Sequence, residues 1–254
     1  MPATGRQGLD PELHFLDGAP QDVARYVLIL DAVNFGSGWF DALRTSTDAL
    51  TARLTAHARA EGPWTAAQLR ALTADEVGAT LELDPAHALT RLYTQGLIQL
   101  GEWLGDAPPE LGHSAERMAE RLTAMPFFAD TGFYKRAQIA AHDLHLAGVA
   151  RYADIARLTI FADNLVPHVL RHFGVLVYDD ELAQLVDAGT ELPRGGEHEV
   201  EIRACAVHAC EALARAHGVP PATLDNRLWN VGQTRLDPAP HPQHRAHITR
   251  TVYY

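Results

Sequence analysis

The chain has 254 residues and 47% of them are hydrophobic, which is enough for one large domain or two small ones with a sizeable core. Its formal net charge of −11 disfavours the binding of nucleic acid polymers, which requires a basic face. No apolar run approaches the roughly eighteen residues of a membrane span, and residues 1–17 lack the apolar core of a signal peptide. These features predict a cytoplasmic protein without a membrane partner.

In chain order, residues 1–19 are expected to form an N-terminal extension and residues 20–254 a single helical domain. Apolar residues recur at helical spacing, and only the terminal residues 249–254 suggest a short strand. The expected helices are residues 20–31, 39–60, 66–72, a long helix opened by Asp84 and Pro85, 114–125, a segment from Lys135 to Leu146, 166–173, 182–188, 197–217, and a last one from Pro220. The fold class predicted is all-α.

Local signals support several of these boundaries. Thr65 and Gln68 have the spacing of a capping box, in which the two side chains satisfy each other's backbone amides. Asp84 is the expected N-cap of the long helix, with Pro85 as its first residue. The helix 197–217 is apolar on several faces, which predicts a central position. Its two cysteines, Cys205 and Cys210, are expected to be small buried hydrophobes and not a disulfide.

The loop 34–40 contains two glycines and three aromatic residues. One interpretation is an ordinary corner between helices, plugged by hydrophobic side chains. The other is a stacking shelf for a planar ligand, because glycine permits close approach and rings such as Phe35 and Trp39 supply a flat face. Both interpretations stay open at this point.

Lys135 is the only lysine among 21 basic residues. A plain surface charge would tolerate arginine, whereas a compact ammonium group suits a phosphate or a tight pocket. Lys135 is therefore a candidate phosphate ligand. The alternative is chance survival on an exposed helix face.

Two carboxylates stand among apolar residues. Asp163 lies within the segment 158–167, and Glu201 lies between Val200 and Ile202. A lone buried carboxylate costs several kcal/mol, so each must be a paired structural charge or a chemical group. Arg203 can pair with Glu199 four residues earlier, which leaves Glu201 without a local cation inside the expected helical core. Glu201 then suits a ligand that carries N–H donors, such as a guanine-like edge.

Metal chemistry is a competing interpretation. His168 and His172 are four apart on one helix, but a zincin motif needs glutamate where Val169 stands. His142 followed by Asp143 resembles the paired element of HD-type phosphohydrolases, with His57 and Asp163 available as further ligands. A metal-dependent phosphohydrolase of this kind is one alternative function, and a non-catalytic helical module that binds a nucleotide is another.

The remaining candidates combine into one chemistry. Aromatic rings could stack a base, Glu201 could read its edge, Lys135 could hold a phosphate, and Asp163 could stabilise a positively charged sugar. Together they describe the binding of a nucleotide and the cleavage of its glycosidic bond through an oxocarbenium-like transition state.

Five short motifs in order give the sequence a resemblance to the queuosine salvage proteins, from residue 20 to the end. They are Asp31-Ala32-Val33-Asn34-Phe35, Phe161-Ala162-Asp163 with Pro167, Glu199-Val200-Glu201-Ile202-Arg203-Ala204, Leu224-Asp225 with Leu228-Trp229, and Thr251-Val252-Tyr253-Tyr254. The segment Gly36-Ser37-Gly38 before Trp39 departs from the tighter aromatic spacing of the family. The resemblance implies hydrolysis of queuosine 5′-phosphate with release of queuine, without metal or other cofactor, on a helical fold like that of DNA glycosylases.

The resemblance also implies roles for individual residues. Asp163 would be the catalytic group, acting on a small-molecule nucleotide and not on a nucleic acid polymer. Substrate contacts are assigned to Asn34, Phe35, Trp39, Lys135, Phe161, Asn164, His198, Glu201, Arg203, Asp225, Trp229 and Tyr254. Of these, Lys135 and Tyr254 would meet the phosphate.

Overall fold

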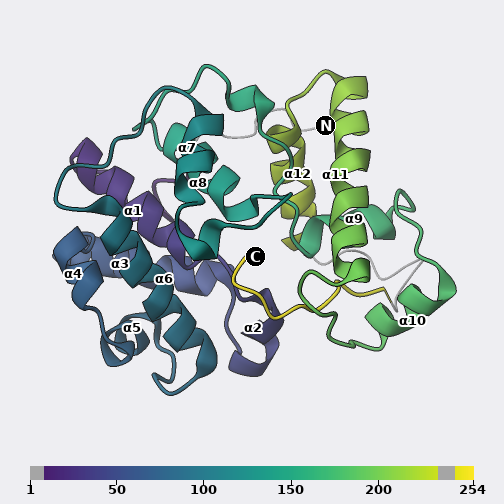
Figure 1. Ribbon diagram of the computed structural model, residues 1–254, viewed down its shortest axis with the longest axis horizontal. Helices are drawn as coiled ribbons and strands as arrows, with labels where there is room; N and C mark the ends of the chain where they lie inside the picture. Colours follow the sequence, from purple (N-terminus) through teal and green to yellow (C-terminus); the bar gives the residue numbers. More distant parts are fainter. Residues whose placement is uncertain (1–8, 234–243) are drawn as a thin grey trace. The chain divides into compact units, whose positions relative to one another are not determined.

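The computed structural model describes residues 9–233 and 244–254. These residues fall into two compact units, which are described separately. The first contains residues 9–155 and Tyr253, and the second contains 156–233, 244–252 and Tyr254. In Figure 1 the first unit runs from purple to teal and the second from green to yellow. The described residues form helices and no strand longer than a single bridge, which confirms the all-α class.

The first unit is built around two long apolar helices. Its helices are α1 Pro20–Ala32, α2 Ser37–Leu43, α3 Thr47–Glu61, α4 Ala66–Ala71, α5 Ala74–Leu81, α6 Ala88–Leu104, α7 Ala115–Leu122, the 3₁₀ turn Pro126–Phe128 and α8 Lys135–Leu146. Helix α1 packs against α3, α6 and α8, while α6 also receives α4 and α5. A second 3₁₀ turn, Ile155–Arg157, follows at the boundary of the units. The apolar stripes seen in the sequence therefore become the contacts between these helices.

The described part of the N-terminal extension is held by helix α3. Arg59 Nη2 donates to the carbonyls of Pro11 and Glu12 at 2.9 and 3.1 Å, and Thr55 Oγ1 donates to the carbonyl of Leu13 at 2.9 Å. Thr55 also shares a 2.6 Å hydrogen bond with Tyr26 of α1. Residues 9–19 thus belong structurally to the first unit.

Capping chemistry explains where sequence prediction succeeded and failed in this unit. The box of Thr65 and Gln68 is present as predicted, and Thr73 forms an unpredicted second box that starts α5. The expected helix 39–60 is wrong as one element, because Arg44 adopts a left-handed conformation (φ 51°) that separates α2 from α3. Helix α6 begins after His87, since the Asp84 side chain closes only a local turn.

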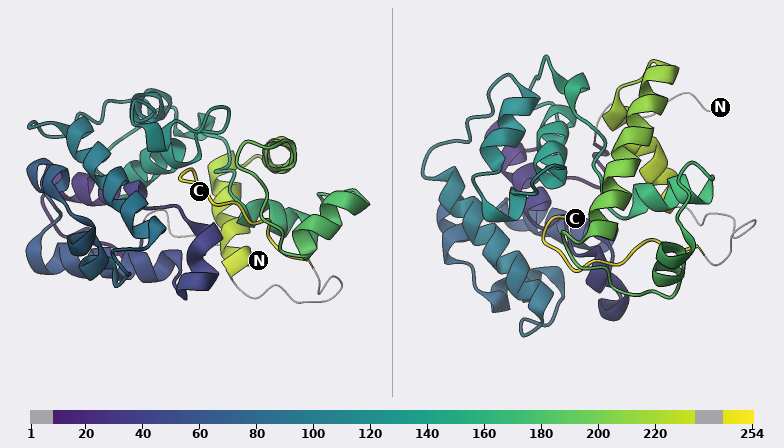
Figure 2. Two further views of the ribbon diagram at one scale, coloured as in Figure 1. Left: turned by 60° about the horizontal axis from the view of Figure 1, so that its bottom comes forward. Right: turned by 45° about the vertical axis from the view of Figure 1, so that its right-hand side comes forward.

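The second unit comprises α9 Leu165–His172, α10 Asp180–Asp187, α11 Glu197–His217 and α12 Pro221–Gln233. Helices α11 and α12 lie side by side in Figures 1 and 2, and α9 packs against both. The expectation that α11 is buried on several faces is wrong, because Val200 is 40% exposed. The buried residues of α11 form one stripe: Glu199, Ile202, Arg203, Ala206, Cys210 and Ala214.

The segment after α12 resumes at residue 244 and forms no strand within 244–254. It makes one isolated parallel bridge between Ile248 and Glu191, and the Leu192 amide donates to the Ile248 carbonyl at 2.8 Å. The suggested strand at residues 249–254 is therefore wrong. Among the helices that the structure describes, none is long and apolar enough to cross a membrane. The organisation of residues 20–254 as a single domain stays a prediction.

Candidate functional site

Asp163 is a buried carboxylate at the start of helix α9. Its side chain is mostly covered, and the residue is 8% exposed. Oδ1 accepts hydrogen bonds from the backbone amides of Leu165 at 2.8 Å and Val166 at 3.1 Å, so the carboxylate caps the first turn of α9. Oδ2 has no hydrogen bond to any residue in the described ranges. One oxygen is therefore anchored and the other is left for a further interaction.

The backbone around Asp163 is clamped on both sides. The Phe161 amide donates to Asp225 Oδ1 of α12 at 2.9 Å. Arg203 Nε of α11 donates to the Ala162 carbonyl at 2.9 Å, and Asn164 Nδ2 donates to the His247 carbonyl at 3.3 Å. Three predicted site residues, Asn164, Arg203 and Asp225, are thus brought to the segment that contains the predicted catalytic group.

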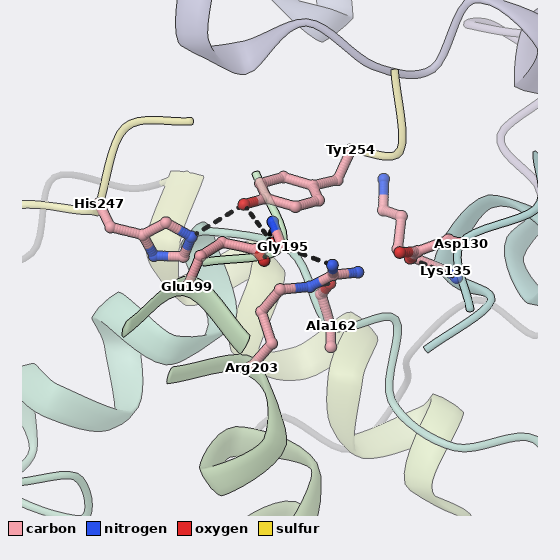
Figure 3. A network of polar contacts seen from close by, with 8 residues as sticks. All are labelled: Asp130, Lys135, Ala162, Gly195, Glu199, Arg203, His247 and Tyr254. Carbon is pink, nitrogen blue, oxygen red and sulfur yellow. Dashed lines mark hydrogen bonds and ion pairs between the residues drawn. The ribbon is translucent and has the colours of Figure 1, made fainter. Parts of the chain in front are cut away.

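A buried ion pair lies beside this segment. Arg203 Nη1 and Glu199 Oε1 are 3.0 Å apart, and these side chains are 3% and 1% exposed. The Tyr254 hydroxyl donates to the same Oε1 at 2.9 Å, while its ring stacks on the Arg203 guanidinium at 4.6 Å. His247 Nε2 lies 3.1 Å from the Tyr254 oxygen (Figure 3). We call Glu199, Arg203, His247 and Tyr254 the Tyr254 network.

The hydrogen bonds of this network and the pKa of His247 together determine the charge and the tautomer of its ring. Burial, followed by the charge of Arg203, lowers the pKa of His247 to about 3, so the ring is neutral near pH 7. Because the Tyr254 hydroxyl donates to Glu199, its oxygen accepts from His247 Nε2–H. His247 Nδ1 is then the unprotonated nitrogen, and it has no partner among the described residues. Burial also raises the pKa of Tyr254, which keeps its hydroxyl protonated.

The structure corrects the choice of glutamate on α11. Glu201 is exposed, so its predicted place inside the helical core is wrong. The buried glutamate is Glu199, whose pairing with Arg203 was the alternative considered from the sequence. His198 and Trp229 are half-buried, whereas Phe161 is buried. The buried stripe of α11 identifies Glu199, because Ile202, Arg203 and Ala206 follow it at helical spacing.

The first unit contains the other predicted residues. Lys135 is 5% exposed, so the alternative of an exposed helix face is wrong. It begins α8, and its amide donates to the carboxylate of Asp130 at 3.3 Å. The preceding residue, Tyr134, has a positive φ of 52°, a conformation that bulky side chains rarely adopt. The only lysine of the chain therefore follows a strained backbone position.

Of the aromatic residues in segment 34–40, Phe35 fills the core of the first unit. Phe35 is 3% exposed, and its ring packs edge-on against Tyr93 and Phe127 with centroid separations of 4.8 and 6.0 Å. This environment matches the interpretation of a plugged corner for Phe35. Trp39 is half-buried on α2, and Asn34 is half-buried between α1 and α2. The proposed stacking of a base on these rings stays a prediction.

The same unit also contains a buried acid that is not among the predicted site residues. Asp31 is 1% exposed, its Oδ1 is 3.5 Å from Asn34 Nδ2, and its Oδ2 has no hydrogen-bond partner among the described residues. Burial and the nearby charge of Asp143 raise the pKa of Asp31 well above its ordinary value. Asp31 follows apolar residues of α1, so the criterion that selected Asp163 also applies to it.

The metal interpretation finds no set of ligands in the described ranges. His142 Nδ1 is 3.6 Å from Asp143 Oδ1, but His57 packs against Trp64 at 4.5 Å. No group of three or more histidine, cysteine, aspartate or glutamate side chains with metal-binding geometry occurs within residues 9–233 and 244–254. The HD-type alternative therefore has no observation in its favour beyond the His142–Asp143 contact.

The fold and this site define an all-α protein with an anchored internal carboxylate. Residues 111–254 match the family model described as "Queuosine salvage protein". The chain is 34% identical to a protein of Sphaerobacter thermophilus over 279 aligned positions, which cover 96% of this chain and 84% of the relative. It therefore belongs to the queuosine salvage protein family, as the sequence motifs indicated.

The Sphaerobacter protein is named queuosine 5′-phosphate N-glycosylase/hydrolase, and two eukaryotic relatives have the same name. The protein of Dictyostelium discoideum is 39% identical over 131 positions, covering 48% of this chain and 40% of the relative. The protein of Mus musculus is 32% identical over 169 positions, covering 56% and 49%. These two matches span about half of each relative or less.

Proposed function

We propose that this chain hydrolyses the N-glycosidic bond of queuosine 5′-phosphate and releases queuine for salvage as a tRNA-modifying base. The names of the relatives support this substrate. The observation that carries the proposal is Asp163, a buried carboxylate with Oδ1 fixed by two backbone amides and Oδ2 free of hydrogen bonds within the described residues. We further propose that the protein acts in the cytoplasm on the free nucleotide.

The chemistry explains why an anchored carboxylate suits this reaction. Queuine is a 7-deazaguanine, so carbon replaces the N7 atom at which purine leaving groups are ordinarily protonated. More of the transition-state stabilisation must therefore come from the sugar side, where positive charge develops as the bond between C1′ and the base nitrogen breaks. A preorganised carboxylate stabilises such a charge without having to reorient.

In the proposed reaction, the bonding electrons leave with the base as the C1′–N bond breaks. Water forms the new C1′–O bond and gives up one proton, and the base nitrogen gains one, so the products are queuine and ribose 5-phosphate. Asp163 Oδ2 stabilises the oxocarbenium-like sugar and accepts the proton of the attacking water. A transient covalent bond between Asp163 and C1′ is the alternative route to the same products.

The test compares two aspartates that both cap helices. Asn caps a helix about as well as Asp does, so Asp163→Asn preserves the bond to the Leu165 amide while removing the charge. We expect it to lower the rate of queuine release by roughly two to three orders of magnitude. The matched control is Asp179→Asn, because Asp179 Oδ1 caps α10 through the Leu182 amide at 2.8 Å.

The assay incubates purified protein with queuosine 5′-phosphate and EDTA, and measures queuine by chromatography. The Asp179→Asn control should match the wild type. If Asp163→Asn also releases queuine at the wild-type rate, Asp163 is only a helix cap and the mechanism is wrong. If the wild-type protein releases no queuine at all, the proposed function itself is wrong.

Lys135 is proposed to determine the preference for the 5′-phosphate. A buried ammonium group pairs well with a phosphate as a point charge. We expect Lys135→Ala to reduce kcat/KM for queuosine 5′-phosphate by about tenfold to a hundredfold and to affect the unphosphorylated nucleoside far less. Equal losses on the two substrates would contradict the assignment. The substrate contacts assigned from the sequence to residues other than Tyr254 stay predictions.

A further inference from the structure

Both chain neighbours of Asp163 are tied to the Tyr254 network. On one side, Arg203 Nε donates to the Ala162 carbonyl at 2.9 Å. On the other side, the His247 carbonyl accepts from Asn164 Nδ2 at 3.3 Å. The path from one side to the other runs through Arg203, Glu199, Tyr254 and His247, with successive contacts of 3.0, 2.9 and 3.1 Å.

The members of this path are nearly inaccessible to water. Glu199, Arg203, His247 and Tyr254 are all at most 2% exposed. Glu199 divides its carboxylate between two sets of donors, since Oε1 faces Arg203 and Tyr254 while Oε2 accepts from the Gly195 amide at 3.1 Å. Polar groups that satisfy one another inside a low-dielectric interior hold each other in one geometry. The hydrogen bonds of the Tyr254 network therefore hold its four side chains in one arrangement.

We propose that Tyr254 and His247 are positioning residues for Asp163, and that they hold the 162–164 backbone through Arg203 and Asn164 so that Asp163 Oδ2 keeps one orientation. This inference rests on the proposed function of Asp163 and replaces the direct phosphate contact that the sequence assigned to Tyr254. The hydroxyl of Tyr254 is already committed to Glu199 and His247, and its ring to Arg203. The contacts of Tyr254 therefore support the two residues, Arg203 and His247, that hydrogen-bond to the chain neighbours of Asp163.

The distinguishing variant is Tyr254→Phe, which keeps the ring on the Arg203 guanidinium and removes both hydroxyl contacts. A small displacement of a reacting group costs rate more than it costs substrate binding, so we expect kcat for queuosine 5′-phosphate to fall about tenfold to a hundredfold while KM changes less than about twofold. A residue that only held the phosphate would give the reverse pattern, with KM raised and kcat preserved. That reverse pattern would overturn the proposal.

The same unit offers a matched control, Tyr178→Phe. Tyr178 also stacks on an arginine that pairs with a carboxylate: Arg171 lies 4.5 Å from its ring and bonds Asp187 at 2.7 Å. No hydrogen bond joins the Tyr178 hydroxyl to the neighbours of Asp163 in the part of the chain that the structure describes. Removal of this hydroxyl should leave kcat and KM within about twofold of the wild type. A loss equal to that of Tyr254→Phe would show a nonspecific packing effect and overturn the proposal.

A second readout does not depend on activity. The Leu165 and Val166 amides are the two groups that Asp163 Oδ1 holds, so their hydrogen exchange, followed by NMR, reports the position of the carboxylate. We expect Tyr254→Phe to accelerate exchange at both amides by about tenfold, and Tyr178→Phe to leave it unchanged. Exchange that is unchanged in Tyr254→Phe would sink the positioning role even if the protein proved not to hydrolyse queuosine 5′-phosphate.

If Tyr254→Phe does not fold, His247→Leu replaces it. This variant removes the donor to the Tyr254 oxygen and keeps the backbone carbonyl that holds Asn164. We expect the same split between kcat and KM and the same accelerated exchange, both smaller in size. Wild-type values for both measurements would overturn the proposal.

Discussion

Both units of the molecule contain buried arginines that stack on aromatic rings, and Arg136 and Arg203 are used differently. In the first unit, Arg136 lies between Phe35 and Phe128 at 4.6 and 4.5 Å. Its Nε and Nη2 donate to the Asp31 carbonyl, and its Nη1 to the Phe127 carbonyl. In the second unit, Arg203 stacks on one ring and divides its donors between the Ala162 carbonyl and the Glu199 carboxylate.

The acid next to each arginine has different partners. Arg136 is turned toward the Asp31 carbonyl, and the Asp31 side chain keeps a raised pKa and an unpaired Oδ2. Glu199 instead receives the guanidinium directly, together with the Tyr254 hydroxyl and the Gly195 amide. A stacked guanidinium thus fixes backbone geometry in both units, and in the second unit it also forms an ion pair with a buried carboxylate.

The largest expected effect comes from Arg203→Met. It leaves the buried Glu199 without its cation and the Ala162 carbonyl without its donor, so we expect the free energy of unfolding to fall by about 3–5 kcal/mol. Urea unfolding followed by circular dichroism measures this change. The double variant Arg203→Met with Glu199→Met should recover much of the loss because it removes both charges of the buried pair. A double variant as unstable as the single one would contradict the importance of the ion pair.

Arg136→Met should cause the next largest loss of free energy of unfolding. It removes three hydrogen bonds to two carbonyls and leaves those oxygens buried, which predicts a loss of about 2–4 kcal/mol. The side chain of methionine can still fill the space between the two rings. Arg136 donates to neutral carbonyl oxygens, whereas Arg203 also forms an ion pair with the buried Glu199, so we expect the smaller loss of the two in the same urea measurement. A larger loss would reverse the comparison.

The first of two pH effects concerns His247. Its pKa is lowered from an ordinary value of 6.5 to about 3, so at intermediate pH the unfolded chain binds a proton that the folded protein does not. The folded state should lose up to about 1.4 kcal/mol of stability per pH unit as pH falls from 6.5 toward 3. His247→Gln should flatten this acid limb in urea unfolding measured at several pH values. An unchanged limb would assign it to other groups.

Asp31 should have the opposite pH dependence. Its raised pKa means that the folded protein keeps a proton that the unfolded chain has lost, so its stabilising contribution is complete below pH 3.8 and disappears as pH rises through the folded pKa. Asp31→Asn should therefore gain stability relative to the wild type with increasing pH. Urea unfolding between pH 4 and 8 checks this. A variant that loses relative stability over that range would contradict the sign.

The smallest effects on stability should come from helix caps that lie outside the buried surroundings of Arg136 and Arg203. Thr73→Ala in the first unit and Asp179→Ala in the second remove side chains that accept from the Glu76 and Leu182 amides. Each should cost about 1 kcal/mol, with no change in the pH dependence described above. Similar losses in the two units would show that the contrast between the arginines arises in the buried clusters. Thermal unfolding at pH 7 is sufficient for this comparison.

Sequence reasoning found what local pattern encodes. Apolar stripes and capping residues predicted most of the helices. The apolar residues on either side of Asp163 indicated that its carboxylate is buried. The choice between Glu199 and Glu201 failed because Val200 and Ile202 seemed equally buried, whereas only the stripe through Ile202 faces the core. The partners of Tyr254 could not be predicted from local spacing. Glu199 is 55 residues away in the sequence, and His247, seven residues away, lies in a segment without helical or strand periodicity.

The two cysteines of α11 differ in a way that has a practical use. Cys205 is exposed, whereas burial raises the pKa of the Cys210 thiol to about 12. A maleimide dye added at neutral pH should therefore label Cys205 alone, since only a reachable thiolate reacts. The native chain thus offers a single attachment point for a fluorophore on the helix that holds the Glu199–Arg203 pair, without any engineered mutation.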